Sequence, residues 1–322
     1  MCFVVPALLS CIATRAAFMP PPPSYGLRCD IACENQPTNR GEGSRYNGKD
    51  KERPNLELAA RSQHAEYKMI LNDYAPWKFN EEEEKCFDAF YVRTKRGHDI
   101  ACLYVKCNAN AKYTILYSHP NAVDLGILSG YLLGLGQEIK CDIFGYDYAG
   151  YGCSSGKPNE QNIYADAEAA YKALREKYSI PREKIILYGQ SIGSVPTIYL
   201  ASIHSVAGVI LHSAFMSAIR MLFPKKIRTM CDPYNNLEKV PKITSPVLVI
   251  HGTKDDIVKI IHGERIYKHC KNPLPPLWIH GAGHNDVERY EPFIKRLKQL
   301  VSGELDGCGK NGFFQRNQER PQ

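Results

Sequence analysis

Ser191 lies in a Gly-x-Ser-x-Gly pattern, which could make it a nucleophile. Four β-favouring residues at 185–188 run into Gly189-Gln190-Ser191-Ile192-Gly193, and a helix-like segment follows at 195–203. A sharp turn between strand and helix lifts the serine hydroxyl above the sheet. The flanking positions must be glycine because a Cβ there would collide with the turn or with the neighbouring strand. The N–H groups that begin the helix then point at a bound oxyanion. The pattern therefore predicts acyl transfer at Ser191.

A serine nucleophile needs a base, and the base needs an acidic group to hold its tautomer. In enzymes that use this strand–turn–helix motif, the chain order is serine, then Asp or Glu, then histidine. An apolar strand at 246–251 leads to Asp255, and the loop at 281–286 carries His284. Both residues follow strands, at the edge where parallel sheets bind ligands. We assign Asp255 as the orienting acid and His284 as the base.

Each of these assignments has an alternative. Asp255 or Asp256 could cap the helix that follows, and Asp256 is the better placed for that role. His280 could be the base instead, but it ends a strand, whereas His284 follows two glycines that permit a tight turn. Ser191 could be a buried turn serine without a chemical role.

An oxyanion needs two N–H donors. The first donor expected is the N–H of Ile192, the residue after the nucleophile, and the second should come from the loop after an earlier strand. The segment at 118–122 fills that place, and the N–H of Asn121 is the candidate, since Pro120 has no N–H. We expect His119 to be a structural hydrogen-bonding residue. The sequence predicts neither a metal site nor another cofactor.

Alternating strands and helices predict an α/β fold, namely a doubly wound, mainly parallel sheet with helices on both faces and a small cap at 214–245. The expected strands are 87–92, 100–105, 113–118, 143–148, 185–188, 208–211, 246–251 and 276–279, and the expected helices are 127–138, 162–178, 195–203, 257–269 and 287–301.

Size and composition fit one large α/β domain with tails. The chain has 322 residues, of which 44% are hydrophobic and 23% charged. We expect an apolar anchor at 1–19, a mostly disordered Pro-rich and polar linker at 20–74, the folded domain at 75–303 and a flexible tail at 304–322. The net charge of +7 comes without a long basic block, which argues against nucleic-acid binding. Twelve cysteines are scattered without a Cys-x-x-Cys pair, which favours a reducing compartment.

The first 19 residues contain an apolar run that Arg15 interrupts. The run is too short to span a bilayer, which takes about 20 residues, and no basic region precedes it as in a signal peptide. Cys2 and Cys11 lie inside it, in a setting that suits S-palmitoylation, and two acyl chains would give stable attachment. The alternatives are a signal peptide and an unmodified disordered tail.

The expected cap combines apolar and basic residues. Phe215, Met216, Met221, Leu222 and Phe223 lie close in sequence to Arg220, Lys225, Lys226 and Arg228. Such a surface would suit an anionic membrane face. The alternative is an ordinary packed cap helix with solvated basic residues.

The motifs resemble those of the alpha/beta hydrolase domain-containing protein 17 family, within the α/β-hydrolase superfamily. The segments that carry the resemblance are 118–126, 146–152, 187–193, 250–255 and 281–286, and the similarity covers about 75–303 plus the run at 17–25. The family's catalytic triad maps onto Ser191, Asp255 and His284. The chain departs from the family pattern at Pro120, where glycine is usual, and in having only two cysteines in its first 20 residues.

The resemblance implies a palmitoyl-protein thioesterase that removes palmitate from S-acylated cysteines of membrane-associated proteins. It also implies a peripheral enzyme at the cytoplasmic face of the plasma or endosomal membrane, with S-palmitoylated proteins and the membrane surface as partners. We expect a monomer. Two other functions are open: an esterase or lipase that acts on small lipid esters with the same triad, and an interaction protein whose oxyanion loop is impaired by Pro120.

Overall fold

A ten-stranded sheet runs through the part of the chain that the computed structural model describes, residues 18–29, 67–222 and 232–305. The strand order is β1-β2-β3-β4-β6-β5-β7-β8-β9-β10. The strands are β1 (Tyr25–Cys29), β2 (Tyr67–Leu71), β3 (Phe87–Arg93), β4 (Asp99–Val105), β5 (Thr114–Ser118), β6 (Asp142–Tyr146), β7 (Ile185–Gln190), β8 (Gly208–His212), β9 (Val247–Gly252) and β10 (Leu277–Ile279).

The sheet is parallel from β6 to β10 and antiparallel from β1 to the β4–β6 pair. Every residue of β5, β7, β8 and β9 is buried. Continuous apolar runs of this kind are typical of parallel strands that are covered on both faces. The predicted α/β fold is confirmed.

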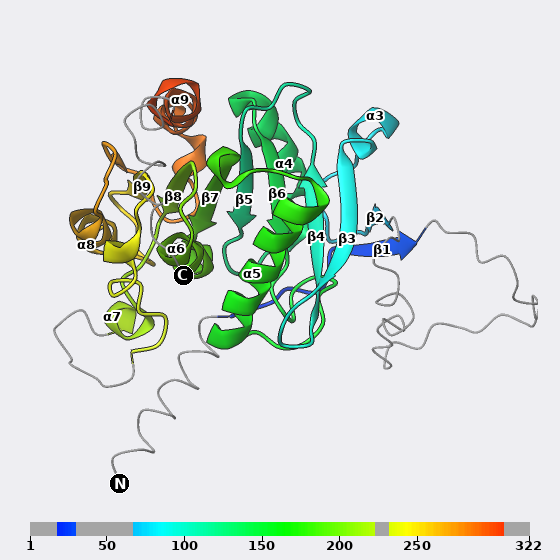
Figure 1. The fold of residues 1–322 in the computed structure, drawn as a ribbon, viewed down its shortest axis with the longest axis horizontal. Coiled ribbons are helices and arrows are strands. Elements are labelled where there is room, and N and C mark those ends of the chain that lie inside the picture. The colour runs from blue at the N-terminus through cyan, green and yellow to red at the C-terminus, as the bar shows by residue number, and fades with distance from the viewer. Residues whose placement is uncertain (1–17, 30–66, 223–231, 306–322) are drawn as a thin grey trace, which may run out of the picture.

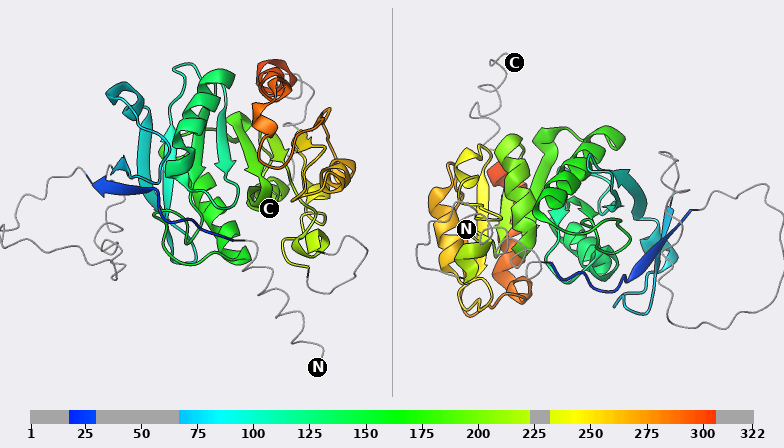
Figure 2. Two further views of the ribbon diagram at one scale, coloured as in Figure 1. Left: turned by 180° about the vertical axis from the view of Figure 1, so that it is seen from behind. Right: turned by 90° about the horizontal axis from the view of Figure 1, so that it is seen from below.

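Helices cover both faces of the sheet (Figure 1). They are α3 (Glu81–Glu84), α4 (Leu125–Ile139), α5 (Glu160–Lys177), α6 (Ser194–Ile203), α7 (Ala218–Leu222), α8 (Ile261–His269) and α9 (Glu291–Gln299). In Figures 1 and 2, α5 packs with α6 on one face, and α4 packs with α9 on the other. Within the described residues, no helix is both long enough and apolar enough to cross a bilayer.

Polar side chains define where α4 and α5 begin. The Asp124 side chain accepts a hydrogen bond from the N–H of Ile127 at 3.0 Å and begins α4, directly after the loop that follows β5. Asn159 caps α5 in the same way through the N–H of Asn162, at 2.9 Å. Such caps satisfy N–H groups that have no partner inside the helix. Because Asp124 is the N-cap residue of α4, it also fixes the end of the loop after β5, which reaches the site described below.

The linker predicted at 20–74 is wrong at both of its ends. Strands β1 and β2 lie inside that range and pair antiparallel with each other. β2 also pairs antiparallel with β3. The folded domain therefore begins before residue 75. Both strands are short and of mixed composition, β1 at the edge of the sheet and β2 next to it, so they lack the apolar run that identified the others. At the other end of the domain, Leu305 is buried, which places the start of the predicted tail in the fold as well.

The described part of the cap is packed against the protein. Phe215 and Met216 are buried, so they do not form the exposed apolar surface that the sequence suggested. Arg220 forms an ion pair with Asp232 at 3.1 Å. Lys225, Lys226 and Arg228 lie outside the described residues, as do Cys2 and Cys11. What the structure shows of this segment agrees with the packed-cap alternative.

Candidate active site

Ser191 lies directly after β7, in a tight 3₁₀ turn (Ser191–Gly193) that leads into α6. Its φ is +52°, a left-handed conformation that a non-glycine residue adopts at a cost of about 1–3 kcal/mol. The preceding residue is held from two sides, because Gln190 accepts from the Tyr117 hydroxyl at 2.7 Å and donates to Glu288 at 2.6 Å. The turn therefore holds the serine in a strained conformation, as the motif predicts.

The glycines on either side of Ser191 are required by close contacts. A Cβ on Gly193 would lie 2.0 Å from the carbonyl oxygen of Ser118 on the neighbouring strand β5. A Cβ on Gly189 would lie 2.4 Å from the carbonyl oxygen of Gly193 within the turn itself. Both collisions expected from the sequence are confirmed.

The structure brings Ser191, His284 and Asp255 together at the carboxyl ends of β7, β10 and β9. His284 Nε2 lies 3.0 Å from Ser191 Oγ, and His284 Nδ1 lies 2.7 Å from Asp255 Oδ2. Asp255 and His284 are both buried. The chain of contacts runs from the nucleophile through the base to the acid.

The Asp255 carboxylate fixes the tautomer of His284. Burial alone would raise the pKa of Asp255, but hydrogen bonds from His251, His284 and the N–H of Val258 hold it well below its usual value. Asp255 is therefore ionised and can only accept, so Nδ1 of His284 carries the proton. Nε2 is then free to accept the proton of Ser191.

Asp255 also shapes the loop in which it lies. Its Oδ1 atom accepts from the N–H groups of Ile257 and Val258, at 3.0 and 2.7 Å. These bonds close the turn after β9 and cap no helix, because α8 begins only at Ile261 and its N-cap residue, Ile260, makes no side-chain cap. Asp256, which the sequence favoured as the helix cap, and His280, the alternative base, are both exposed.

The two expected oxyanion donors border the same cavity as the nucleophile. Asn121 and Ile192 line it together with Ser191, and Pro120 lies beside them. We refer to residues 119–124 as the oxyanion loop. Ala122 within the loop has a φ of +59°, so the loop, like Ser191, contains a left-handed residue.

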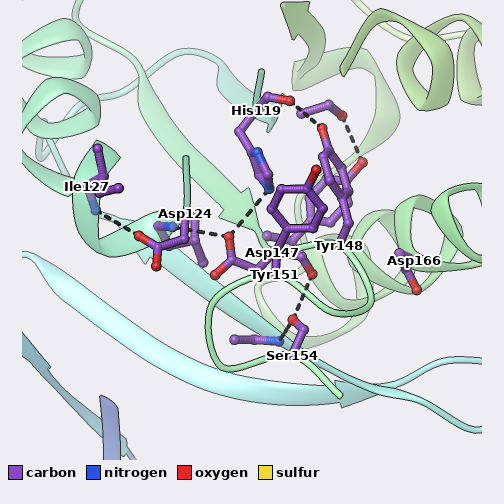
Figure 3. Close-up of polar contacts among 12 residues, drawn as sticks. His119, Asp124, Ile127, Asp147, Tyr148, Tyr151, Ser154 and Asp166 are labelled. Atoms are coloured by element: carbon purple, nitrogen blue, oxygen red, sulfur yellow. Dashed lines mark hydrogen bonds and ion pairs between the residues drawn. The ribbon is translucent and has the colours of Figure 1, made fainter. Parts of the chain in front are cut away.

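His119 supports the oxyanion loop from inside the protein (Figure 3). Its ring is fully buried and stacked on Tyr148, with ring centroids 4.0 Å apart. Nδ1 donates to the carbonyl oxygen of Pro120 at 2.8 Å, and Nε2 lies 3.4 Å from Asp147. Burial lowers the pKa of His119 to about 4, so the ring is neutral at physiological pH. These contacts agree with the structural role expected for it.

A cavity of about 420 Å³ opens beside Ser191 and His284. Its volume falls in the range of small-molecule sites. Most of its remaining lining is apolar, from residues of the chain start, the cap and the loop after β9: Met19, Phe215, Ala218, Met221, Tyr234 and Ile257. Such a lining can accept an alkyl chain next to the nucleophile.

Sequence reasoning missed two participants in the site. His251 Nε2 lies 3.3 Å from Asp255 Oδ2, which gives the acid a second histidine contact. Its place at the end of β9, four residues before the acid, could have indicated this. Met19 was placed in an anchor segment, yet it lines the cavity. The resemblance at 17–25 includes this position, but nothing in that run indicated a place in the active site.

Comparison with known families identifies a hydrolase fold. A family model described as the alpha/beta hydrolase fold matches residues 134–232, and one described as Serine hydrolase (FSH1) matches residues 194–285. Among solved structures, the chain is similar to an esterase from Pyrococcus furiosus, with a TM-score of 0.57, 16% identity and coverage of 70% of this chain and 95% of that one. An alpha-beta serine hydrolase homologue from Coxiella burnetii gives a TM-score of 0.53 at 16% identity, covering 70% and 100%. These structures support the fold.

Curated relatives are much more similar in sequence. The chain is 45% identical over 304 residues to the human alpha/beta hydrolase domain-containing protein 17B, which covers 94% of this chain and 95% of the relative. It is 46% identical to protein 17C of Xenopus laevis, over 94% of this chain and 93% of that one. Human protein 17C is 49% identical over 74% of this chain and 72% of its own length.

Proposed function

Because the chain belongs to the alpha/beta hydrolase domain-containing protein 17 family and is a serine hydrolase of the α/β-hydrolase type, we propose that it removes palmitate from S-acylated cysteines of proteins. The observation that carries the proposal is the apolar cavity that opens beside the hydrogen-bonded Ser191–His284 pair. A long alkyl chain bound there would bring its thioester carbonyl to the nucleophile.

In the first half of the reaction, Ser191 Oγ attacks the thioester carbonyl carbon while His284 Nε2 takes the hydroxyl proton. The negative charge of the tetrahedral intermediate develops on the carbonyl oxygen. When the intermediate collapses, the C–S bond breaks and the cysteine sulfur leaves with the proton from His284. The product of this half is palmitoyl-Ser191.

In the second half, His284 takes a proton from water and the resulting oxygen attacks the acyl carbon. The bond to Ser191 Oγ breaks, the serine regains its proton from His284, and palmitate leaves. Asp255 stays ionised and stabilises the His284 imidazolium in both halves. The low pKa of Asp255 supports this role because the carboxylate does not compete for the proton.

The oxyanion would be bound between the N–H groups of Ile192 and Asn121. Ile192 lies in the turn (Ser191–Gly193) that leads into α6, where N–H groups have no partner inside the helix. Pro120 does not close the site, because Asn121, Ile192 and Ser191 still border a common cavity. This observation favours an active enzyme over an interaction protein with an impaired oxyanion loop.

Attachment to a membrane is a further part of the proposal. Acylation of Cys2 and Cys11 would hold the enzyme peripherally at the cytoplasmic face of the plasma or endosomal membrane, where S-palmitoylated proteins occur as substrates. Phe18 and Met19 are the first residues that the structure describes, and Met19 lines the cavity. An anchor ahead of these residues would thus join the domain next to the substrate site.

Chain-length preference separates the proposed activity from that of a small-ester esterase. Wild-type protein should hydrolyse a palmitoylated cysteine peptide with a kcat/KM well above that for the same peptide carrying an acetyl thioester. A preference for the acetyl peptide, or for short oxygen esters, would instead support the esterase alternative.

A further inference from the structure

Residues 18–25, which we call the arm, run from the edge of the sheet to the mouth of the active site. The arm leads into the edge strand β1 at one end, and its other end reaches the oxyanion loop and the cap. Figure 2 shows this blue segment crossing from β1 toward the middle of the molecule. The arm is remote in sequence from the loops that it contacts, so chain connectivity does not place it there. Its path is set by the specific contacts described next.

The Met19 N–H is the contact nearest to the chemistry. It donates to Asn121 Oδ1 at 2.8 Å and to the Tyr151 hydroxyl oxygen at 3.1 Å. The Tyr151 hydroxyl in turn donates to Asn121 Oδ1 at 2.6 Å. Two donors therefore converge on the side chain of the residue whose backbone N–H is the expected oxyanion donor.

Phe18 holds this end of the arm in place. Its side chain is buried and packs edge-on against two tyrosines, Tyr151 at 6.3 Å and Tyr234 at 5.9 Å between ring centroids. Tyr151 comes from the loop after β6, and Tyr234 from the described part of the cap. The Met19 N–H is thereby set between the cap and the oxyanion loop.

Ser24 secures the far end of the oxyanion loop. Its N–H donates to Asp124 Oδ2 at 2.7 Å, and its hydroxyl donates to Asp124 Oδ1. Both residues are fully buried. The fit is close, because a Cβ on Gly126 would lie 2.3 Å from Ser24 Oγ. A buried carboxylate needs such donors, so Asp124 and the arm depend on each other.

Tyr25 is linked to the first residue of the loop through Asp147, which lies beside His119 in Figure 3. The Tyr25 hydroxyl donates to Asp147 Oδ2 at 2.7 Å, and Asp147 Oδ1 lies 3.4 Å from His119 Nε2. Asp147 also accepts from the N–H of Leu125 at 3.1 Å, just past the loop. The arm thus contacts the middle and the end of the oxyanion loop directly, and it approaches the start of the loop only through Asp147.

We propose that the arm is a positioning element for the oxyanion hole. The Met19 N–H, acting through Asn121 Oδ1, holds the Asn121 backbone N–H where charge develops on the carbonyl oxygen. The proposal rests on the proposed oxyanion role of Asn121. Loss of this hydrogen bond should weaken transition-state binding and leave ground-state binding of the substrate largely intact.

Two alternative substitutions of Met19 isolate the contribution of the Met19 N–H hydrogen bond. Met19→Ala and Met19→Pro both remove the side chain from the cavity, but only Met19→Pro also removes the N–H. Pro20 follows directly, and residues before proline favour extended backbone, so a further proline is compatible with the arm. The full-length variants are compared on a soluble p-nitrophenyl acetate substrate and on a palmitoylated peptide, with thermal unfolding as the measure of folding.

We expect kcat of Met19→Pro to fall about tenfold to about a hundredfold below that of Met19→Ala, at similar KM, since loss of a whole donor costs roughly 100- to 1,000-fold. The inhibition constant of an alkyl boronic acid, whose tetrahedral adduct resembles the intermediate, should rise by the same factor. Phe18→Ala should lower kcat in the same way, with partial recovery in Phe18→Leu. This second pair decides the question if Met19→Pro does not fold.

Equal kcat values and equal boronic acid affinities for Met19→Pro and Met19→Ala would overturn the proposal. So would a fall in kcat that follows only the loss of folded protein in both the Met19 and Phe18 pairs. A wild-type enzyme that cleaves p-nitrophenyl acetate but not the palmitoylated peptide would refute the proposed substrate alone, because the acetate comparison would still decide the role of the arm.

Discussion

Asp255 holds His284 with one carboxylate oxygen and its own loop with the other. Oδ2 lies 2.7 Å from His284 Nδ1, while Oδ1 accepts from the N–H groups of Ile257 and Val258. The Asp255 side chain therefore orients the base and also fixes the loop in which Asp255 itself lies. The two roles can be separated by substitution.

Asp255→Asn should abolish most activity and preserve the fold. The amide oxygen can still accept from Ile257 and Val258, but the amide nitrogen cannot accept from His284 Nδ1. We expect kcat to fall by about 10⁴-fold with little change in Tm, because the tautomer of His284 is lost. Asp255→Ala should lose both activity and Tm. Steady-state ester hydrolysis and thermal unfolding check the pair, and near-normal activity in Asp255→Asn would contradict the assignment.

Gly193→Ala should disrupt the turn that carries Ser191. The new Cβ would lie 2.0 Å from the Ser118 carbonyl oxygen, and backbone atoms cannot move aside cheaply. We expect a loss of several kcal/mol in the free energy of unfolding, or failure to fold. Gly134→Ala is the matched control, since it lies at an exposed position within α4 with nothing within 4 Å. It should stabilise the protein by about 0.5–1 kcal/mol in denaturant unfolding. Equal effects at the two glycines would refute the packing argument.

Asp166 should make the protein less stable as the pH rises. Its side chain is fully buried and accepts from the Ala149 N–H at 2.8 Å, and burial raises its pKa to about 7 from the usual 3.8. A raised carboxyl pKa stabilises the folded state fully below the unfolded pKa, and this contribution is lost as pH rises through about 7. Asp166→Asn, which cannot ionise, should therefore flatten the fall in Tm between about pH 4 and about pH 8. The same pH dependence in both proteins would show that Asp166 does not titrate there.

Ala218→Trp should reduce the turnover of long acyl chains selectively. Ala218 lines the apolar cavity, and an indole ring there would fill space that a palmitoyl chain needs. We expect kcat/KM to fall at least about tenfold for a palmitoylated peptide, with a smaller change for an acetylated one. Ile203→Trp is the control, because Ile203 is exposed at the end of α6. A parallel loss for both acyl chains in Ala218→Trp would mean that the alkyl chain binds elsewhere.

The parallel half of the sheet and the catalytic constellation could be predicted from the sequence. Buried parallel strands are continuous apolar runs, and the residues that follow them, Asp255 and His284, meet at one edge because the strands share a direction. Ser191 was identifiable because its turn tolerates only glycine at the neighbouring positions. These features are determined by short stretches of chain.

Strands β1 and β2 and the contacts of the arm could not be predicted in this way. β1 and β2 are stabilised by pairing with each other and by tertiary contacts of Tyr25, which no local pattern displays. Met19 acts through its backbone N–H, which every residue except proline possesses. For the cap, composition alone suggested an exposed apolar surface, whereas Phe215 and Met216 are buried in the fold. Long-range packing decided all of these positions.

The central claim is that Ser191 cleaves long-chain acyl thioesters on proteins. It is tested most directly by palmitate release from a palmitoylated cysteine peptide, measured for wild type and Ser191→Ala side by side with fluorophosphonate labelling. The account predicts that wild-type protein is labelled and releases palmitate, while Ser191→Ala does neither and keeps a wild-type Tm. Palmitate release by Ser191→Ala at a rate close to wild type, or a labelled wild-type protein that leaves the palmitoylated peptide intact, would contradict it.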